Sequence, residues 1–219
     1  MSTTQLDQLA QALTAAFHQG TNGEEQFSHL FQQLLHLLAK GQPVSPEEIA
    51  AVTGQSPAEA AAYLAQLPNV ELDEAGNLVG MGLTLKPTPH HFEIEGRILY
   101  TWCALDALLF PILLEKPAVV TSPCAVTGAP IKISVTPDGV TAVKPEKAVI
   151  SIVKAPTMEN IRGSFCHYVH FFTSANAAAG WLSQHPGTVL LSVAEAYHLG
   201  QMLSQEAFNI FTVAGADCQ

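Results

Sequence analysis

Two capping boxes follow each other in the first third of the chain: Ser45-Pro46-Glu47-Glu48 and Ser56-Pro57-Ala58-Glu59. Each places a serine at the N-cap, a proline at the first helical position and a glutamate three residues after the serine, which together mark the start of a helix. Gly54 can end the first helix before the second begins. The stretch therefore predicts two short helices joined by a tight turn, the second running over residues 57–66.

A hairpin is predicted directly after these two helices. Residues 70–72 and 78–80 flank the turn sequence Asp73-Glu74-Ala75-Gly76-Asn77, and turn residues between two apolar runs favour a hairpin. Helix, turn, helix and hairpin form the outline of a winged helix. Upstream, apolar residues recur at spacings of three and four over residues 6–17 and 27–38, which predicts two amphipathic helices.

The winged-helix outline suggests DNA binding, but the charge of the chain argues against it. The 219 residues include 9 Lys and Arg against 19 Asp and Glu, a formal net charge of −10. Between Lys40 and Lys86 there is no cation at all. Nucleic-acid phosphates and anionic membranes both require clustered cations. We therefore expect neither a nucleic acid nor a membrane as partner.

The composition predicts a folded protein of the cytoplasm. Apolar residues make up 48% and charged residues 13% of the chain, the opposite of the balance found in disordered proteins. The longest strongly apolar run, Ala107–Leu114, is too short to cross a bilayer, and Met1–Ala12 lacks the features of a signal peptide. Cysteines of a reducing compartment are expected to be reactive, metal-binding or buried rather than disulfide-bonded.

After Gly82 the sequence turns to β-structure. Short alternating apolar runs separated by turn residues predict strands near residues 83–85, 91–94, 97–100, 118–121, 131–135, 140–143, 148–153 and 188–191. Helices are predicted over residues 175–184 and, after a third capping box at Ser192, towards Phe211. The fold class is therefore α+β: a helical, winged-helix-like N-terminal module over residues 1–81, packed on a mixed α/β core with antiparallel strands over residues 82–219.

One candidate for chemistry is the pair Cys103 and Asp106. A helix predicted from about Thr101 to Phe110, ended near Pro111, would place both on one face. A thiolate is a soft nucleophile and metal ligand, and a carboxyl group can accept and return a proton. The alternative is a buried cysteine that serves only as a small apolar side chain.

A second candidate is the segment Gly163–Phe172, which holds Cys166, His167 and His170 but no charged side chain. It can be a buried, extended or irregular segment, or it can supply a zinc site together with Cys103, although the usual Cys-x-x-Cys spacing is absent. Three other features are not expected to take part in chemistry. Turns flank Cys124, which favours a structural thiol; Cys218 lies next to the end; and His90-His91 is expected at a surface or strand edge.

Four blocks in this order resemble the bacterial organomercurial lyases (alkylmercury lyases): Gly82–Leu85, Leu99–Asp106, Cys124–Pro130 and Ser164–Phe172. The likeness runs from about residue 27 to about residue 205. It implies a winged-helix-like module on a mixed α/β catalytic core, and an enzyme that cleaves the carbon–mercury bond by protonolysis. By motif position, the resemblance places the catalytic and mercury-binding residues at Cys103, Asp106 and Cys166. Some members carry a second cysteine where this chain has His167.

The resemblance also implies partners. The substrate is an organomercurial delivered by cellular thiols, no resident cofactor is needed because mercury arrives with the substrate, and the Hg(II) product passes to a mercuric reductase. Two alternatives stay open at this point. The same cysteines would serve a non-catalytic protein that binds or delivers a soft metal, and an acidic winged helix could belong to a mercury-sensing regulator.

Overall fold

The structure, a computed structural model, describes residues 1–20, 25–67, 69–157 and 160–206. In this part of the chain the helices are α1 (Thr3–Gly20), α2 (Glu25–Leu38), α3 (Pro46–Thr53), α4 (Pro57–Gln66), α5 (Asp106–Leu113), α6 (Ile161–Ser164), α7 (Ala175–Gln184) and α8 (Val193–Glu206), with a 3-10 turn η2 (Cys166–Tyr168). The strands are β1 (Glu71–Leu72), β2 (Leu78–Met81), β3 (Leu83–Thr84), β4 (His90–Ile94), β5 (Arg97–Thr101), β6 (Ala118–Pro123), β7 (Pro130–Thr136), β8 (Gly139–Lys144), β9 (Val149–Val153), β10 (Phe171–Phe172) and β11 (Thr188–Ser192).

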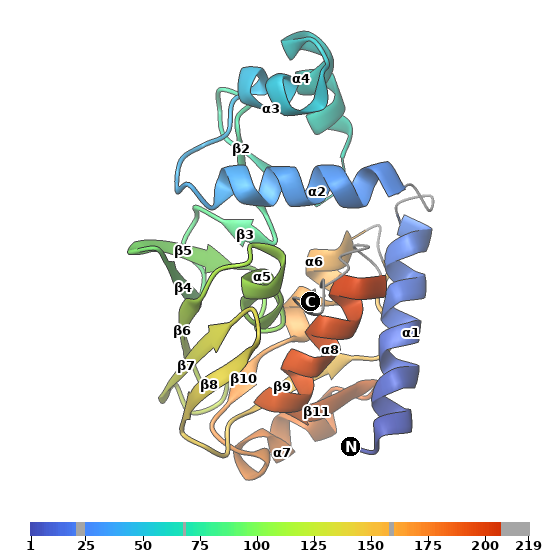
Figure 1. Cartoon of the computed structure of the whole chain (residues 1–219). Coiled ribbons are helices and arrows are strands. Elements are labelled where there is room, and N and C mark those ends of the chain that lie inside the picture. Colours follow the sequence, from blue (N-terminus) through green and yellow to red (C-terminus); the bar gives the residue numbers. More distant parts are fainter. Residues whose placement is uncertain (21–24, 68, 158–159, 207–219) are drawn as a thin grey trace, which may run out of the picture.

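The predicted winged-helix outline is confirmed. In α3 the hydroxyl of Ser45 accepts from the backbone N–H of Glu48, whose carboxylate accepts from the backbone N–H of Ser45. Ser56 and Glu59 make the same reciprocal pair at α4. The antiparallel strands β1 and β2 form the predicted hairpin. Helices α3 and α4 stand at one end of the molecule, away from the lower sheets (Figure 1).

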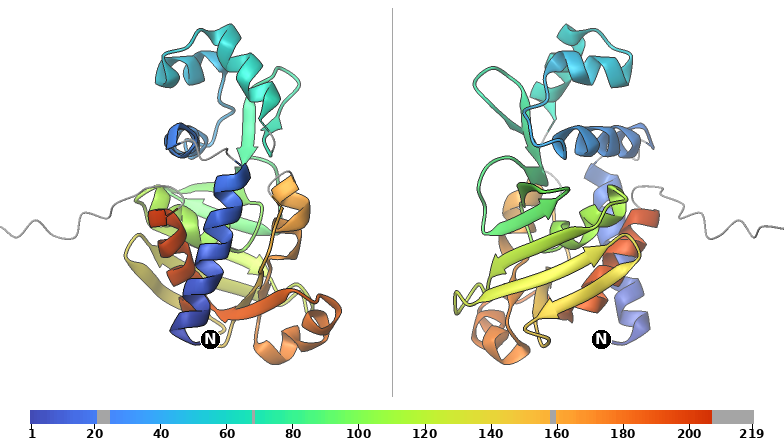
Figure 2. Two further views of the ribbon diagram at one scale, coloured as in Figure 1. Left: turned by 90° about the vertical axis from the view of Figure 1, so that its right-hand side faces the viewer. Right: turned by 60° about the vertical axis from the view of Figure 1, so that its left-hand side comes forward.

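The predicted antiparallel α+β core is also confirmed. The larger sheet has eight strands in the order β1-β2-β3-β5-β4-β6-β7-β8, and the smaller has the order β10-β9-β11. Glu95 and Gly96 join β4 to β5 with φ values of 49° and 75°, the left-handed geometry of a tight hairpin turn. Because β2 pairs with β3, the larger sheet continues across the predicted domain boundary at residue 82. The division of the chain into two domains stays a prediction. Figure 2 shows α1 and α8 packed beside one another over the sheets.

Helix α5 forms the centre of the core. Its residues from Ala107 to Leu113 are all buried, as expected for a helix that is apolar on every side. The prediction for its bounds was wrong, because α5 begins at Asp106 and Pro111 lies inside it. Pro111 removes one backbone donor, but the helix continues because packing on all sides outweighs local propensity. The later start of the helix leaves residues 102–105 as a turn.

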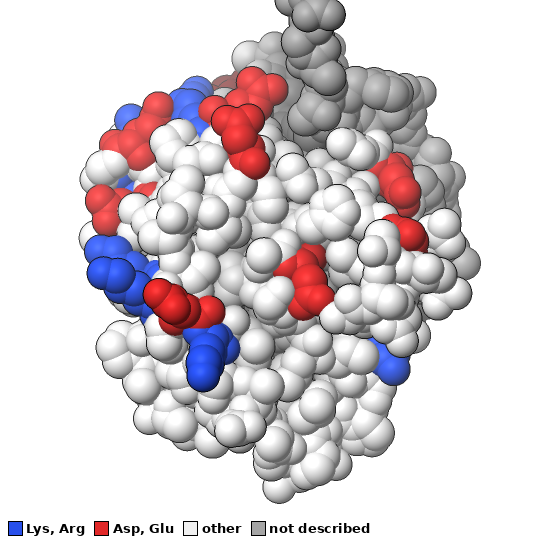
Figure 3. All heavy atoms as spheres, turned by 60° about the horizontal axis from the view of Figure 1, so that its bottom comes forward, with Lys and Arg blue, Asp and Glu red and all other residues white. Residues whose placement is uncertain are grey.

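The described helices include none with the length and apolar character needed to cross a membrane. Charged side chains are also sparse on the face that Figure 3 shows, where cations and acids lie mostly next to one another at one edge. This face has no continuous basic patch.

The expectation for His90 was wrong, because its side chain is buried and only its neighbour His91 is exposed. His90 begins β4, and its Nδ1 lies 2.9 Å from the hydroxyl oxygen of Ser122 on β6. Burial, together with the nearby His170 ring, lowers the pKa of His90 to about 3. The sequence could not show this, because a histidine at the end of a strand can point to either face.

We expect His90 to make the protein less stable as the pH falls. An unfolded histidine has a pKa near 6.5, so between pH 6.5 and pH 3 the unfolded chain binds more protons than the folded one, and folding loses stability. Between pH 7 and pH 5 the loss from this group is about 2 kcal/mol. Urea unfolding should therefore show that, from pH 7 to pH 5, the free energy of unfolding of wild type falls by about 2 kcal/mol more than that of His90→Gln. His91→Gln, which changes an exposed histidine, is the control, and its free energy of unfolding should fall as much as that of wild type. A fall of the same size in His90→Gln would contradict the prediction.

Candidate active site

Cys103 lies in the turn between β5 and α5, and backbone hydrogen bonds fix the position of this turn. The N–H of Trp102 donates to the carbonyl of Gly82 at 2.8 Å, and the N–H of Ala104 donates to the carbonyl of Val169 at 3.1 Å. The hydroxyl of Thr101 donates to the carbonyl of Cys103 at 2.9 Å. Gly82 has φ +76°, and a Cβ there would lie 2.7 Å from the ring of Phe110, so only glycine fits at this position.

Cys166 lies at the start of η2, directly after α6. The side chain of Asn160 caps α6 by accepting from the N–H of Gly163 at 2.9 Å. Ser151 on β9 holds the far end of the segment, because its hydroxyl donates to the carbonyl of Tyr168 at 2.7 Å and accepts from the N–H of His170 at 3.0 Å. The bond from Ala104 to Val169 joins this segment to the turn that carries Cys103. Two irregular segments, distant in sequence, are thus held side by side.

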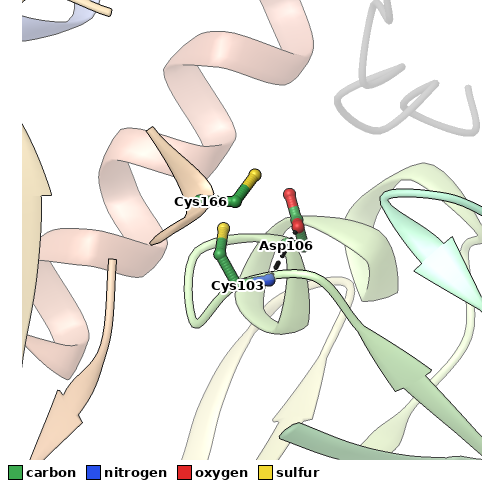
Figure 4. A group of neighbouring side chains, drawn as sticks. All are labelled: Cys103, Asp106 and Cys166. Carbon is green, nitrogen blue, oxygen red and sulfur yellow. Dashed lines mark hydrogen bonds between the residues drawn. The ribbon is translucent and has the colours of Figure 1, made fainter. Parts of the chain in front are cut away.

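The structure brings together the three residues that the sequence singled out. The Sγ atoms of Cys103 and Cys166 and one carboxylate oxygen of Asp106 all lie within 4.8 Å of one another. Figure 4 shows both thiols and the carboxylate turned towards a common point. Asp106, the first residue of α5, accepts from the backbone N–H of Cys103 at 3.1 Å. Cys103 is fully buried and Cys166 is 5% exposed, so the cluster lies just below the surface.

Burial changes the acidity of this cluster. It raises the pKa of Asp106 to about 6, although hydrogen bonds from the thiol and the backbone of Cys103 act in the opposite direction. Burial also raises the pKa of the Cys103 thiol, and the neighbouring Cys166 and the charge of Asp106 raise it further. At neutral pH the site therefore holds a protonated Cys103 thiol beside a carboxylate that can accept its proton.

The alternative zinc site does not form within the described part of the chain, because neither histidine belongs to the cluster of three ligands. The ring of His170 instead lies edge-on to Trp181, with ring centroids 5.8 Å apart. His167 is exposed and packs against Tyr168.

Three residues that contact one another next to the Cys103 turn had no role predicted from the sequence. Arg162 on α6 places its guanidinium carbon 4.9 Å from the centre of the Trp102 ring, and its Nη1 forms an ion pair with Glu71 on β1. The indole N–H of Trp102 is buried without a hydrogen-bond partner in the described residues. The only sequence signal was position, because Trp102 precedes Cys103 and Arg162 lies four residues before Cys166.

Cys124 is buried, as predicted, but it is surrounded by hydrogen-bond donors. The Thr173 hydroxyl donates to its sulfur at 3.8 Å. Burial alone would raise the pKa of Cys124; hydrogen bonds from the side chain and backbone of Thr127 and from the backbone of Thr173 and Val126 lower it to about 7. This thiol therefore serves as an acceptor that orders the turn after β6.

We expect Cys124→Ala to destabilise the protein by about 1–3 kcal/mol, because it leaves these buried donors without an acceptor. Cys124→Ser, which keeps an acceptor, should cost less. Thermal or urea unfolding measures the difference. A Cys124→Ser variant that unfolds more easily than Cys124→Ala would contradict the role of the thiol as an acceptor.

Comparisons with known proteins agree with this fold. The family model described as alkylmercury lyase matches residues 83–205, and a second model, the helix-turn-helix domain of alkylmercury lyase, matches residues 5–82. The chain belongs to the alkylmercury lyase family.

Individual relatives cover most of the chain. An alkylmercury lyase from Streptomyces lividans is 48% identical over 202 residues, covering 92% of this chain and 94% of the relative. One from Bacillus cereus is 46% identical over 200 residues, with 91% of each chain covered. A crystal structure described as the mercury-bound form of MerB2 superimposes with a TM-score of 0.77 at 23% identity, covering 90% of this chain and 99% of that one. At that identity the likeness establishes the fold.

Proposed function

We propose that this protein is an alkylmercury lyase that cleaves the carbon–mercury bond of an organomercurial by protonolysis, using Cys103, Cys166 and Asp106. The observation that carries the proposal is the cluster itself: two thiols and a carboxylate whose ligand atoms lie within 4.8 Å of one another. Membership of the family supports the reaction, and the geometry supports the choice of residues.

The two thiols supply what mercury requires. Mercury is very soft and prefers sulfur over oxygen or nitrogen ligands. An organomercurial arrives bound to a cellular thiol, so its capture is an exchange of one thiolate for another. One protein sulfur forms an uncleaved adduct that excess external thiol can reverse by the same exchange. A second sulfur raises the coordination number of mercury and pushes electron density onto the carbon, which then accepts a proton more readily.

Asp106 supplies the proton. The Cys103 thiol must lose its proton when it binds mercury, and the adjacent carboxylate of Asp106 can accept it. With its pKa raised to about 6, the carboxylate of Asp106 is a stronger base than that of an exposed aspartate, and once protonated it is still a competent acid near neutral pH. Delivery of that proton to the carbon breaks the carbon–mercury bond, releases a hydrocarbon and leaves Hg(II) on the two sulfurs.

Several finer points belong to the same proposal. Because mercury enters with the substrate and leaves as product, the protein needs no resident cofactor, only external thiols. The Hg(II) product would pass to a mercuric reductase. We place the reaction in the cytoplasm, where cellular thiols are reduced and the cysteines of the site can stay free.

The experiment that tests the function is incubation with phenylmercury and excess thiol, followed by measurement of benzene. A lyase releases benzene with repeated turnovers. A protein that only binds or delivers mercury needs the thiols but no proton donor, so it would retain phenylmercury intact. The buried carboxylate beside the thiols favours the lyase.

A further inference from the structure

In this otherwise acidic protein, a small cationic cluster contacts Trp102, the residue that precedes Cys103. The ion pair between Arg162 and Glu71 forms its centre. The hydroxyl of Thr84 donates to the second carboxylate oxygen of Glu71 at 2.5 Å. Although burial acts in the opposite direction, these hydrogen bonds and the charges of Arg162 and Lys86 lower the pKa of Glu71. Two cations and one carboxylate leave the cluster with a net charge of about +1, in a chain whose formal net charge is −10.

The guanidinium of Arg162 is fixed but still open to solvent. Trp102 covers one of its faces at 4.9 Å, and Glu71 binds it at Nη1. The side chain of Arg162 is 49% exposed, whereas that of Glu71 is 11% exposed. A guanidinium carries five N–H donors, and a planar group held on one edge can offer the other edge to a carboxylate with little further loss of entropy.

Arg162 is linked to both cysteines, to Cys166 through the chain and to Cys103 through its contact with Trp102. It lies on α6, four residues before Cys166, which begins η2. Its aromatic partner Trp102 is bonded directly to Cys103. The segment that carries Cys166 also runs along the surface, since Arg162 and His167 on either side of that cysteine are exposed. A thiol adduct that approaches Cys166 from solution therefore meets this cluster.

We propose that Arg162, assisted by Lys86, binds the carboxylate of the thiol that delivers the organomercurial, so that adducts of carboxylate-bearing thiols are the preferred substrates. This inference rests on the proposed lyase function and names its substrate class. In the exchange, a protein thiolate attacks mercury, a new sulfur–mercury bond forms, and the bond from mercury to the carrier sulfur breaks. The carrier leaves as a thiolate and takes a proton from solvent, with no change of oxidation state.

The test compares two carriers of the same length, of which one carries a carboxylate and the other a neutral amide. Phenylmercury is presented as its adduct with 3-mercaptopropionate or with 3-mercaptopropionamide, the neutral amide of the same length, and kcat/KM for benzene release is measured for each. We expect wild type to prefer the anionic carrier by about 5-fold at low ionic strength, the size of a good exposed ion pair. Added salt should reduce this preference.

Three variants locate the preference. In Arg162→Gln the ratio of the two kcat/KM values should fall to about 1, and in Lys86→Gln it should lie between that value and the wild-type ratio. The matched control is Arg97→Gln, which removes the same kind of cation from the opposite end of β5, where Arg97 pairs with Glu95. That variant should keep the wild-type ratio. Because each ratio is taken within one variant, general changes in activity cancel.

Two results would overturn the inference: equal kcat/KM for both carriers in wild type, or a wild-type ratio in Arg162→Gln. If Arg162→Gln does not fold, Lys86→Gln decides, because Lys86 is exposed and its removal must still lower the ratio. Failure of the lyase function looks different. In that case neither carrier yields benzene with wild type, whereas failure of this inference leaves benzene release intact and independent of the carrier.

Discussion

Asp106→Asn is expected to hold an organomercurial without cleaving it. Asparagine keeps the size of the side chain but cannot carry a proton from the Cys103 thiol to the carbon. Loss of a positioned general acid lowers the rate by about 10²–10⁴-fold, or roughly 3–5 kcal/mol of barrier. The two sulfurs remain, so phenylmercury should stay bound as an uncleaved adduct. A single turnover measures this: the variant is loaded with phenylmercury, excess is removed, and bound mercury and released benzene are measured.

The matched control for this experiment is Asp138→Asn. Asp138 is an exposed aspartate in the turn between β7 and β8, so its amide should release benzene at the wild-type rate. If Asp106→Asn also releases benzene at that rate, Asp106 is not the acid, and a thiol or water delivers the proton.

Cys103→Ser and Cys166→Ser are expected neither to retain phenylmercury nor to cleave its carbon–mercury bond. A hydroxyl is a hard and poor ligand for mercury, so each substitution leaves one sulfur, which neither holds the metal firmly nor pushes electron density towards the carbon. The same single-turnover assay should therefore find little bound mercury and little benzene. This differs from the expected result for Asp106→Asn, in which mercury is retained.

Cys124→Ser provides the control for the two cysteine variants. It makes the same chemical change at a third buried thiol that lies outside the cluster, and it should cleave phenylmercury at close to the wild-type rate. Full cleavage by Cys166→Ser would contradict the two-thiol mechanism.

Local signals predicted the parts of the fold that local interactions determine. The capping boxes at Ser45 and Ser56 lie where expected, since each is complete within four residues. The turn at Glu95-Gly96 was predictable for the same reason. The bounds of α5 were not, because burial on all sides keeps Pro111 inside the helix. The burial of His90 depends on which face of β4 meets β6, and nothing near His90 in sequence reports that.

The site was predictable only in part. The residue types at positions 103 and 106 indicated thiol and acid chemistry, but spacing alone did not join them to Cys166. Family resemblance made that connection, and the structure places the three side chains together through the bond from Ala104 to Val169. The ion pair of Arg162 with Glu71 joins residues far apart in the chain. No periodicity or motif reports such a contact, because it depends on how the hairpin packs against α6.

The placement of the two thiols on separate segments has a consequence for the mechanics of the chain. A mercury ion held by both sulfurs closes a loop of about 60 residues, just as a disulfide would, and by loop-closure entropy such a cross-link opposes unfolding by about 4 kcal/mol. The product complex would therefore be the most heat-resistant form of the protein, and its melting temperature would report occupancy directly. Each turnover ends by opening that cross-link. An acceptor that takes Hg(II) one sulfur at a time frees the segments in sequence and avoids breaking both bonds at once.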